Sequence, residues 1–161
     1  MRRSFDRPLV RTIGDGNCLY YSLMAGLDIL QCPDRPPNAM ALKKQLINYI
    51  DSTGRYDHRL VFVMQTLDWD QWVATHRRPN AWGDEVVIVA FSRLYPEIQL
   101  RVQTRQKNGA TNTQTFNELA SRVIVIGTDQ RHFNLITCLC PRDSDLSRVE
   151  GYSCKSKIRW T

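Results

Sequence analysis

Residues 15–22 read Asp15-Gly16-Asn17-Cys18-Leu19-Tyr20-Tyr21-Ser22, a stretch in which a cysteine lies between a turn and an apolar helical pattern. Leucines then recur with gaps of four, four and three residues, at Leu19, Leu23, Leu27 and Leu30. This spacing predicts a helix that begins at Cys18 and buries one face. A thiol in that place lies at the positive end of the helix dipole, where the thiolate is favoured over the thiol.

Further helices are expected between the Cys18 helix and residue 95. Asn38 can cap a second helix, whose buried face carries Leu42, Leu46, Ile47 and Ile50. Short helices are plausible over residues 58–67 and 68–74. The run 82–95 contains four consecutive β-branched residues, 86–89, but we expect a helix there, because Asp84 and Glu85 suit a first turn and Pro96 ends the pattern.

The last third of the chain changes to the period of β-strands. Apolar residues alternate with polar ones over 98–102, Asn108-Gly109 forms a hairpin-type turn, and 113–116 can return as a strand. Apolar runs over 123–126 and 133–139 predict two more strands. We therefore expect an α/β (α+β) fold, a small twisted β-sheet flanked by helices, with the Cys18 helix packed on the sheet.

Length and composition restrict the class of protein. The chain has 161 residues, which suits a single domain over 1–161 with a core at roughly 8–140 and a C-terminal extension at 141–161. No apolar run is long enough to span a membrane, and the charged start lacks an apolar signal core. Five cysteines is an odd number, so a reduced, cytoplasmic setting fits best. The net charge of +6 is spread thinly and indicates a solvated basic surface, with a nucleic-acid-binding domain as an alternative.

A second candidate element lies far from the cysteine, at His132-Phe133-Asn134. A cysteine nucleophile needs a base, usually a histidine, and the histidine needs a third group to orient its ring. Asn134 is two residues after His132, so both side chains are expected on one side of a strand. The glycine-rich turn before Cys18 could add backbone N–H groups to an oxyanion hole.

Each of these residues also has a plain structural interpretation. A single cysteine is usually a small buried hydrophobic residue, and His132 could be a satisfied core histidine at a strand edge. We interpret His58 and His76 as surface residues, because their neighbours are charged.

Three segments together resemble one family, the ovarian-tumour (OTU) deubiquitinating cysteine proteases. Residues 15–20 resemble its cysteine box, Trp82-Gly83-Asp84-Glu85 resembles its Trp-Gly-Gly-Glu segment, and residues 123–126 followed by 132–134 resemble its histidine box. The boxes occur in the family's order, and the separation of Cys18 and His132 by 114 residues is ordinary for it. The resemblance covers roughly residues 8–140.

The resemblance implies a papain-like fold of OTU type and a cysteine isopeptidase. Such an enzyme removes ubiquitin or a ubiquitin-like modifier from conjugates through a thiol nucleophile and an acyl-enzyme intermediate. It implies Cys18 as nucleophile, His132 as general base, Asn134 as the ring-orienting group and Asp15 as support for the cysteine loop. The residues implied to contact the substrate are Trp82, Gly16, Asn17, Asp84 and Glu85.

The resemblance also implies ubiquitin or a ubiquitin-like modifier as partner, with no cofactor, metal, membrane or nucleic acid. We expect a monomer in the cytoplasm, which is the host cytoplasm if the chain belongs to a larger viral polyprotein. Three positions depart from the family pattern. Asn134 stands where many members have an acid, Asp84 stands where the second glycine of the motif usually lies, and Tyr20-Tyr21 replaces an aromatic-then-basic pair.

Two other functions stay open beside this one. A catalytically weak OTU-like module would bind ubiquitin without cutting it, although the Cys18 and His132 pair argues against that. A zinc site could use Cys138 and Cys140 with Cys154 or Cys32, but the one-residue gap between the first two is not the usual spacing of zinc ligands.

Overall fold

The structure, a computed structural model, describes residues 16–129 and 132–139. The helices are α2 (Cys18–Ile29), α3 (Ala39–Asp51), the 3₁₀-helix η1 (Thr53–Tyr56), α4 (His58–Val63), α5 (Trp69–His76) and α6 (Glu85–Leu94). The strands are β1 (Ile98–Arg105), β2 (Thr111–Phe116), β3 (Arg122–Thr128) and β4 (Phe133–Leu139). The expected order, helices first and a small sheet after them, is confirmed.

Side-chain caps set where four of the helices begin. Asn38 accepts the backbone N–H of Ala41 at the start of α3. Asp57, Asp68 and Asp84 cap α4, α5 and α6 in the same way. Each cap satisfies a backbone donor that the first turn of a helix leaves without an intrahelical partner.

The four strands form one mixed sheet in the order β2-β1-β3-β4. The central strands β1 and β3 are parallel, while β2 and β4 pair antiparallel at the two edges. β4 carries a bulge opposite Val125 and Ile126, so its register with β3 shifts there. The carboxyl ends of β1 and β3 and the amino ends of β2 and β4 therefore meet at one end of the sheet.

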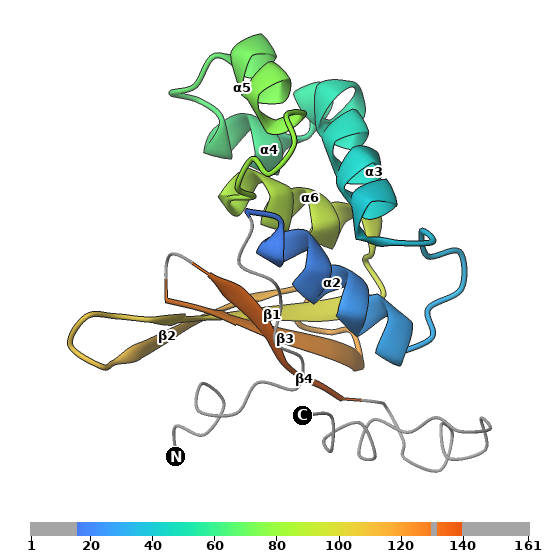
Figure 1. Ribbon diagram of the computed structural model, residues 1–161, viewed down its shortest axis with the longest axis vertical. Coiled ribbons are helices and arrows are strands. Elements are labelled where there is room, and N and C mark those ends of the chain that lie inside the picture. Colours follow the sequence, from blue (N-terminus) through green and yellow to red (C-terminus); the bar gives the residue numbers. More distant parts are fainter. Residues whose placement is uncertain (1–15, 130–131, 140–161) are drawn as a thin grey trace.

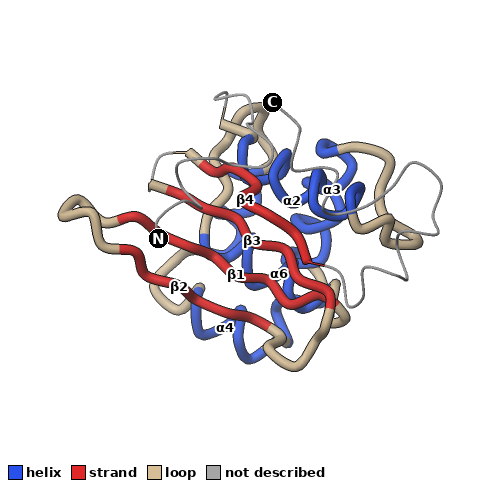
Figure 2. The backbone as a smooth tube through the Cα atoms, turned by 90° about the horizontal axis from the view of Figure 1, so that it is seen from below, coloured by secondary structure: helices blue, strands red, loops and turns tan. Residues whose placement is uncertain are grey.

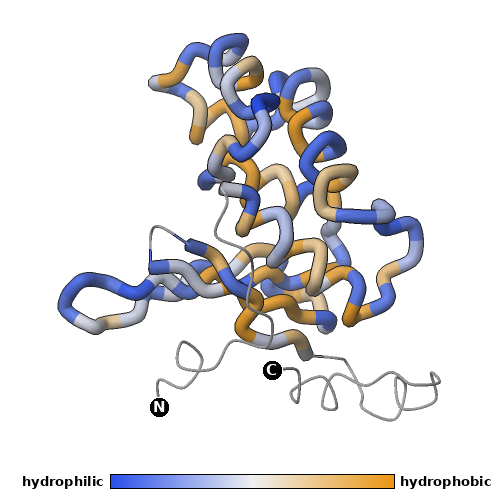
Figure 3. Tube along the Cα trace, in the orientation of Figure 1, coloured by the Kyte–Doolittle hydropathy of each residue, from blue (hydrophilic) through white to orange (hydrophobic). Residues whose placement is uncertain are grey.

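The labelled helices lie on one side of the sheet, with α2 and α6 next to it and α3, α4 and α5 farther away (Figure 1). Figure 2, turned by 90°, shows the sheet in front and the helices behind it. Figure 3 shows hydrophobic segments both on the helices and on the strands. Residues of α2, α3, α6 and all four strands contribute to the main core.

Glycine allows α2 to lie close to the sheet. A Cβ atom on Gly26 would lie 2.7 Å from the Cδ1 atom of Ile124 in β3. This close approach matters for the site, because the same helix carries Cys18 at its first residue.

Some boundaries differ from the expected ones. The helix expected over 58–67 ends at Val63, and the next one continues to His76. The helix expected over 82–95 is confirmed, but it begins at Glu85, after its Asp84 cap. Its β-branched residues do not prevent a helix, because every residue from Val86 to Ser92 is buried and tertiary packing outweighs local propensity. The predicted extension at 141–161 lies outside the described residues.

Candidate active site

Cys18 is buried, with 6% of its surface exposed, and it is the first residue of α2. The backbone N–H of Phe133, at the start of β4, donates a hydrogen bond to the Cys18 sulfur over 3.3 Å. An N–H donor and the positive end of a helix both favour a sulfur that carries negative charge. The first turn of α2 and the first residue of β4 together hold this sulfur.

The bond from Phe133 brings the expected histidine segment to Cys18. His132 immediately precedes Phe133, and its own backbone N–H donates to Asp129 Oδ1 at 3.1 Å. Asn134 follows within β4, opposite Gly127 of β3. The side chains of His132 and Asn134 are half-buried. The strand that begins here thus brings the backbone of the His132-Phe133-Asn134 segment to the Cys18 sulfur.

A pocket of about 560 Å³ opens in front of Cys18. Its lining comes from the start of α2, the segment before α6, the first turn of α6 and all four strands: Gly16, Cys18, Trp82, Gly83, Asp84, Glu85, Ile88, Val102, Thr104, Gln114, Thr128 and Phe133. Sites in α/β folds commonly lie at the carboxyl ends of parallel strands, as this one does.

The segment Trp82-Gly83-Asp84-Glu85 forms one wall of the pocket. Trp82 is 59% exposed, so an aromatic face is available at the rim. Gly83 packs on Leu19 of α2, where a Cβ atom would lie 2.7 Å from Leu19 Cδ2. Glu85 is exposed beside them. Four of the five residues expected to contact substrate, all but Asn17, line this pocket.

Asp84 also has a structural role in this wall. Its carboxylate accepts the N–H of Val86 and the indole N–H of Trp72, and it lies 3.2 Å from Nε2 of His76. Burial alone would raise the pKa of Asp84, but hydrogen bonds from His76 and Trp72 outweigh it and hold the pKa below its usual value. The carboxylate is therefore ionised and fixed at neutral pH.

The interpretation of His76 as a surface residue is wrong. Its ring stacks on Trp72 with centroids 3.8 Å apart, and only 12% of the side chain is exposed. Nδ1 lies 2.8 Å from the Trp72 carbonyl oxygen and Nε2 faces Asp84. The charged residues next to His76 in the sequence do not indicate its contact with Asp84, which caps the next helix.

The turn before Cys18 is held by the loop that follows α5. Gly16 has φ of +94°, and a Cβ atom there would lie 2.1 Å from the carbonyl oxygen of Asn80. Only glycine fits this position. Asn17 is buried, and its side-chain amide donates to Asn80 Oδ1 at 3.0 Å. The structure thus places Asn17 behind the turn rather than in the pocket lining, and Asp15 lies outside the described residues.

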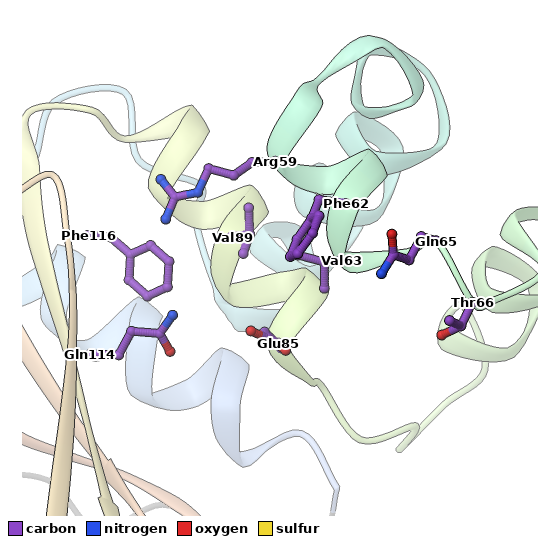
Figure 4. A pocket seen from close by; sticks show the side chains of 9 residues that line it. All are labelled: Arg59, Phe62, Val63, Gln65, Thr66, Glu85, Val89, Gln114 and Phe116. Carbon is purple, nitrogen blue, oxygen red and sulfur yellow. The ribbon is translucent and has the colours of Figure 1, made fainter.

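A second, smaller pocket of about 350 Å³ adjoins the first, because Glu85 and Gln114 line both. Figure 4 shows its apolar side chains, which come from α4, α6 and β2. Phe62 on this side is 70% exposed, although it is aromatic. The two pockets therefore meet at Glu85, the first residue of α6.

A metal site and a membrane span are the two other possibilities for the described residues. In ranges 16–129 and 132–139, no three His, Cys, Asp or Glu side chains gather so that they could hold a metal ion. The described cysteines of the zinc alternative, Cys32 and Cys138, are both buried. No helix within those ranges is both long and apolar enough to cross a membrane.

Sequence reasoning missed three residues near the site. Asp129 holds the backbone of His132, and Phe133 reaches Cys18 through its N–H. Lys43 of α3 is buried and binds Asn17. The sequence could have indicated that Lys43 is buried, because it lies four residues before Ile47 and seven before Ile50 and so shares the buried face of their helix.

A buried cysteine at a helix start, facing a histidine segment that leads into a strand, is the architecture of a papain-like cysteine protease. Residues 13–128 match the family described as OTU-like cysteine protease. The match contains Cys18 and the Trp82–Glu85 wall and ends just before His132. It spans well over half of the 161 residues, and the chain belongs to this family.

Solved structures share the fold at low sequence identity. The Hazara virus OTU bound to ubiquitin is 19% identical, with a TM-score of 0.61 over 81% of this chain and 80% of that chain. An OTU deubiquitinase from Wolbachia pipientis wMel bound to ubiquitin is 15% identical, with a TM-score of 0.58 over 82% of this chain and 94% of that chain.

The viral OTU domain protease from Taggert virus has 19% identity and a TM-score of 0.58 over 78% of this chain and 76% of that chain. A search of curated protein sequences gave no significant match. Viral and bacterial structures occur together among these neighbours, and a viral origin for this chain stays a prediction.

Proposed function

We propose that the protein is a cysteine isopeptidase that removes ubiquitin or a ubiquitin-like modifier from lysine side chains. The observation that carries the proposal is the pocket in front of Cys18, with the His132-Phe133-Asn134 segment held against the sulfur by the Phe133 N–H. Family membership supports the reaction type. Two neighbouring structures that contain ubiquitin support the partner.

In this reaction the Cys18 sulfur attacks the carbonyl carbon of the isopeptide bond, and His132 holds the proton that the thiol gives up. The carbonyl oxygen becomes an oxyanion, which backbone N–H groups at the start of α2 stabilise. His132 then protonates the leaving lysine amine, and the C–N bond breaks to leave a thioester on Cys18. Water attacks the thioester with His132 as base, which releases the modifier as a carboxylate and restores the thiol. Asn134 orients the ring of His132, and Asp15 supports the turn.

The two adjoining pockets suit an extended tail that ends in small residues. Trp82 lines the same pocket as Cys18, where the diglycine end of a ubiquitin tail would pass. Glu85 lies where both pockets meet and offers a carboxylate to a basic side chain of the tail. The exposed, apolar side of the second pocket suits a larger apolar group farther from the cleaved bond.

The test is covalent labelling by ubiquitin that carries a C-terminal electrophile. The wild-type protein should gain the mass of one probe, and Cys18→Ala should gain none. Cys138→Ala is the matched control, because it removes another buried thiol and should leave labelling intact. Labelling of Cys18→Ala through a different cysteine would refute the assignment.

The same samples test the alternative of a binding module. A wild-type protein that binds ubiquitin but neither reacts with the probe nor cleaves ubiquitin dimers would be a catalytically weak member. A panel of ubiquitin dimers and fusions to ubiquitin-like modifiers then identifies the substrate. A salt-sensitive shift with nucleic acid, and no cleavage, would favour the basic nucleic-acid-binding domain.

A further inference from the structure

Lys43 is an unusual residue to find inside this protein. It lies in α3 with only 7% of its surface exposed. A buried ammonium loses its hydration, so it is costly unless hydrogen bonds replace the water. A methionine would fill similar space without that cost. The presence of a lysine here therefore points to a role for its hydrogen bonds, which a methionine could not form.

Those bonds reach two segments that are far apart in the sequence and adjacent at the site. Lys43 Nζ donates to the carbonyl oxygen of Arg78 at 2.8 Å and to Asn17 Oδ1 at 3.4 Å. The ammonium also lies 5.5 Å from the centre of the Tyr20 ring in the first turn of α2. One charged group thus joins α3, the residues around Cys18, and the loop that leads to Trp82.

The two segments that Lys43 joins are also bound to each other. Asn17 donates to the side chain of Asn80, and Gly16 lies directly against the Asn80 carbonyl. Both turns are conformationally demanding, with φ of +94° at Gly16 and +62° at Asn80. Asn17 is the residue before α2, yet within the described chain its side chain serves these contacts instead of capping the helix. The Asn17 side chain thus stabilises the turn and, among the described residues, does not cap α2.

We propose that Lys43 is a positioning residue that holds the Gly16-Asn17 backbone and the 78–80 turn in one arrangement around Cys18. In this arrangement the backbone N–H groups before and at Cys18 are set in advance for the oxyanion. The inference rests on the proposed hydrolase function. Lys43 then affects the formation of the oxyanion when the sulfur attacks the carbonyl carbon, and it does not affect the formation of the Cys18 thiolate.

The test compares Lys43→Met with Lys44→Met, which removes the neighbouring exposed lysine of the same helix. With a fluorogenic amide of ubiquitin, Lys43→Met should lower kcat by about 10- to 100-fold, approaching the loss of one oxyanion-hole donor, and change KM by less than about 3-fold. Alkylation of Cys18 by iodoacetamide, which forms no oxyanion, should stay within about 3-fold of wild type. Lys44→Met should match wild type in all three.

A second variant covers the case in which Lys43→Met folds poorly. Asn80→Gly keeps the positive φ and removes only the side chain that binds Asn17, and it should also lower kcat without raising KM. Wild-type kcat in both variants, or kcat and alkylation that fall together, would overturn the inference.

Hydrogen exchange tests the inference without turnover. Lys43→Met should speed amide exchange over residues 16–20 by about 10-fold, with β1 and β3 unchanged. Unchanged exchange at residues 16–20 would overturn the role of Lys43. A wild-type protein that hydrolyses no ubiquitin amide would instead count against the proposed function.

Discussion

Asn134 follows the proposed base by two residues and offers an amide where an acid would give stronger support to an imidazolium ring. An amide oxygen can accept the ring N–H and fix the orientation of His132, but it carries no compensating charge. The residue should therefore matter less than the base that it orients.

We expect Asn134→Ala to lower kcat/KM by about 10-fold and His132→Ala by about 1,000-fold, because only His132 transfers protons. Asn134→Asp should retain activity. The measurement is hydrolysis of a ubiquitin amide across pH 6–9, with circular dichroism as the control for folding. Equal losses in the two alanine variants would mean that Asn134 does more than orient.

At the scale of the elements, the carboxylate of Asp57 binds residues of three helices, α3, α4 and α6. Asp57 caps α4 by accepting the N–H groups of Arg59 and Leu60, and it binds Arg93 of α6 at 2.7 Å and the Tyr49 hydroxyl of α3 at 3.0 Å. The carboxylate is 5% exposed. Burial would raise the pKa of Asp57, but the hydrogen bonds from Arg93 and Tyr49 outweigh it and lower that pKa.

A carboxyl whose folded pKa lies below its unfolded value stabilises the fold at pH above the unfolded pKa, and this contribution is lost as the pH falls through the folded pKa. Asp57→Asn should therefore lower the free energy of unfolding at pH 7 by about 2 kcal/mol, a value reduced by the solvent exposure of Arg93. The difference from wild type should shrink below about pH 4, the ordinary range of a carboxyl.

Urea unfolding at pH 7 and pH 3 measures both values. Asp70→Asn is the matched control, since its carboxylate is exposed and pairs with Arg55 on the surface. The control should change stability by less than about 0.5 kcal/mol at either pH. A difference for Asp57→Asn that is the same at both pH values would contradict the role given to its charge.

At the scale of the whole molecule, the distance between α2 and the sheet sets the relation of Cys18 to β4. Gly26 and Ile124 lie in contact at this interface, and the Cys18 sulfur meets the Phe133 N–H at its end. A larger side chain at Gly26 would push the helix from the sheet.

Gly26→Val should lower the free energy of unfolding by about 2 kcal/mol through overpacking and slow alkylation of Cys18. Ile124→Ala opens space opposite, so the double variant should lose at least about 1 kcal/mol less than the sum of the single variants. Urea unfolding of the four proteins measures this coupling. The control pair is Gly26→Val with Val123→Ala, which should be additive because Val123 belongs to a separate cluster. Additivity in the first pair would refute close packing of α2 on β3.

Much of the fold was accessible from local patterns in the sequence. The leucine spacing after Cys18, the Asn38 cap and the Asn108-Gly109 turn each act within a few residues, and the corresponding elements are present. The Trp82–Glu85 segment was expected at the cleft, and it lines the pocket with Cys18. The roles of Cys18, His132 and Asn134 remain predictions that the kinetic tests address.

The sequence by itself determined the type and order of the elements, because helix periodicity, caps and tight turns depend on neighbouring residues. Only the tertiary structure decided that Lys43 binds Asn17, that His76 faces Asp84 and that the Phe133 N–H reaches Cys18. The last of these contacts joins residues 115 positions apart. The physical reason is that such contacts depend on how α2, α3 and α6 pack over the sheet, and packing is a property of the assembled core that no local pattern records.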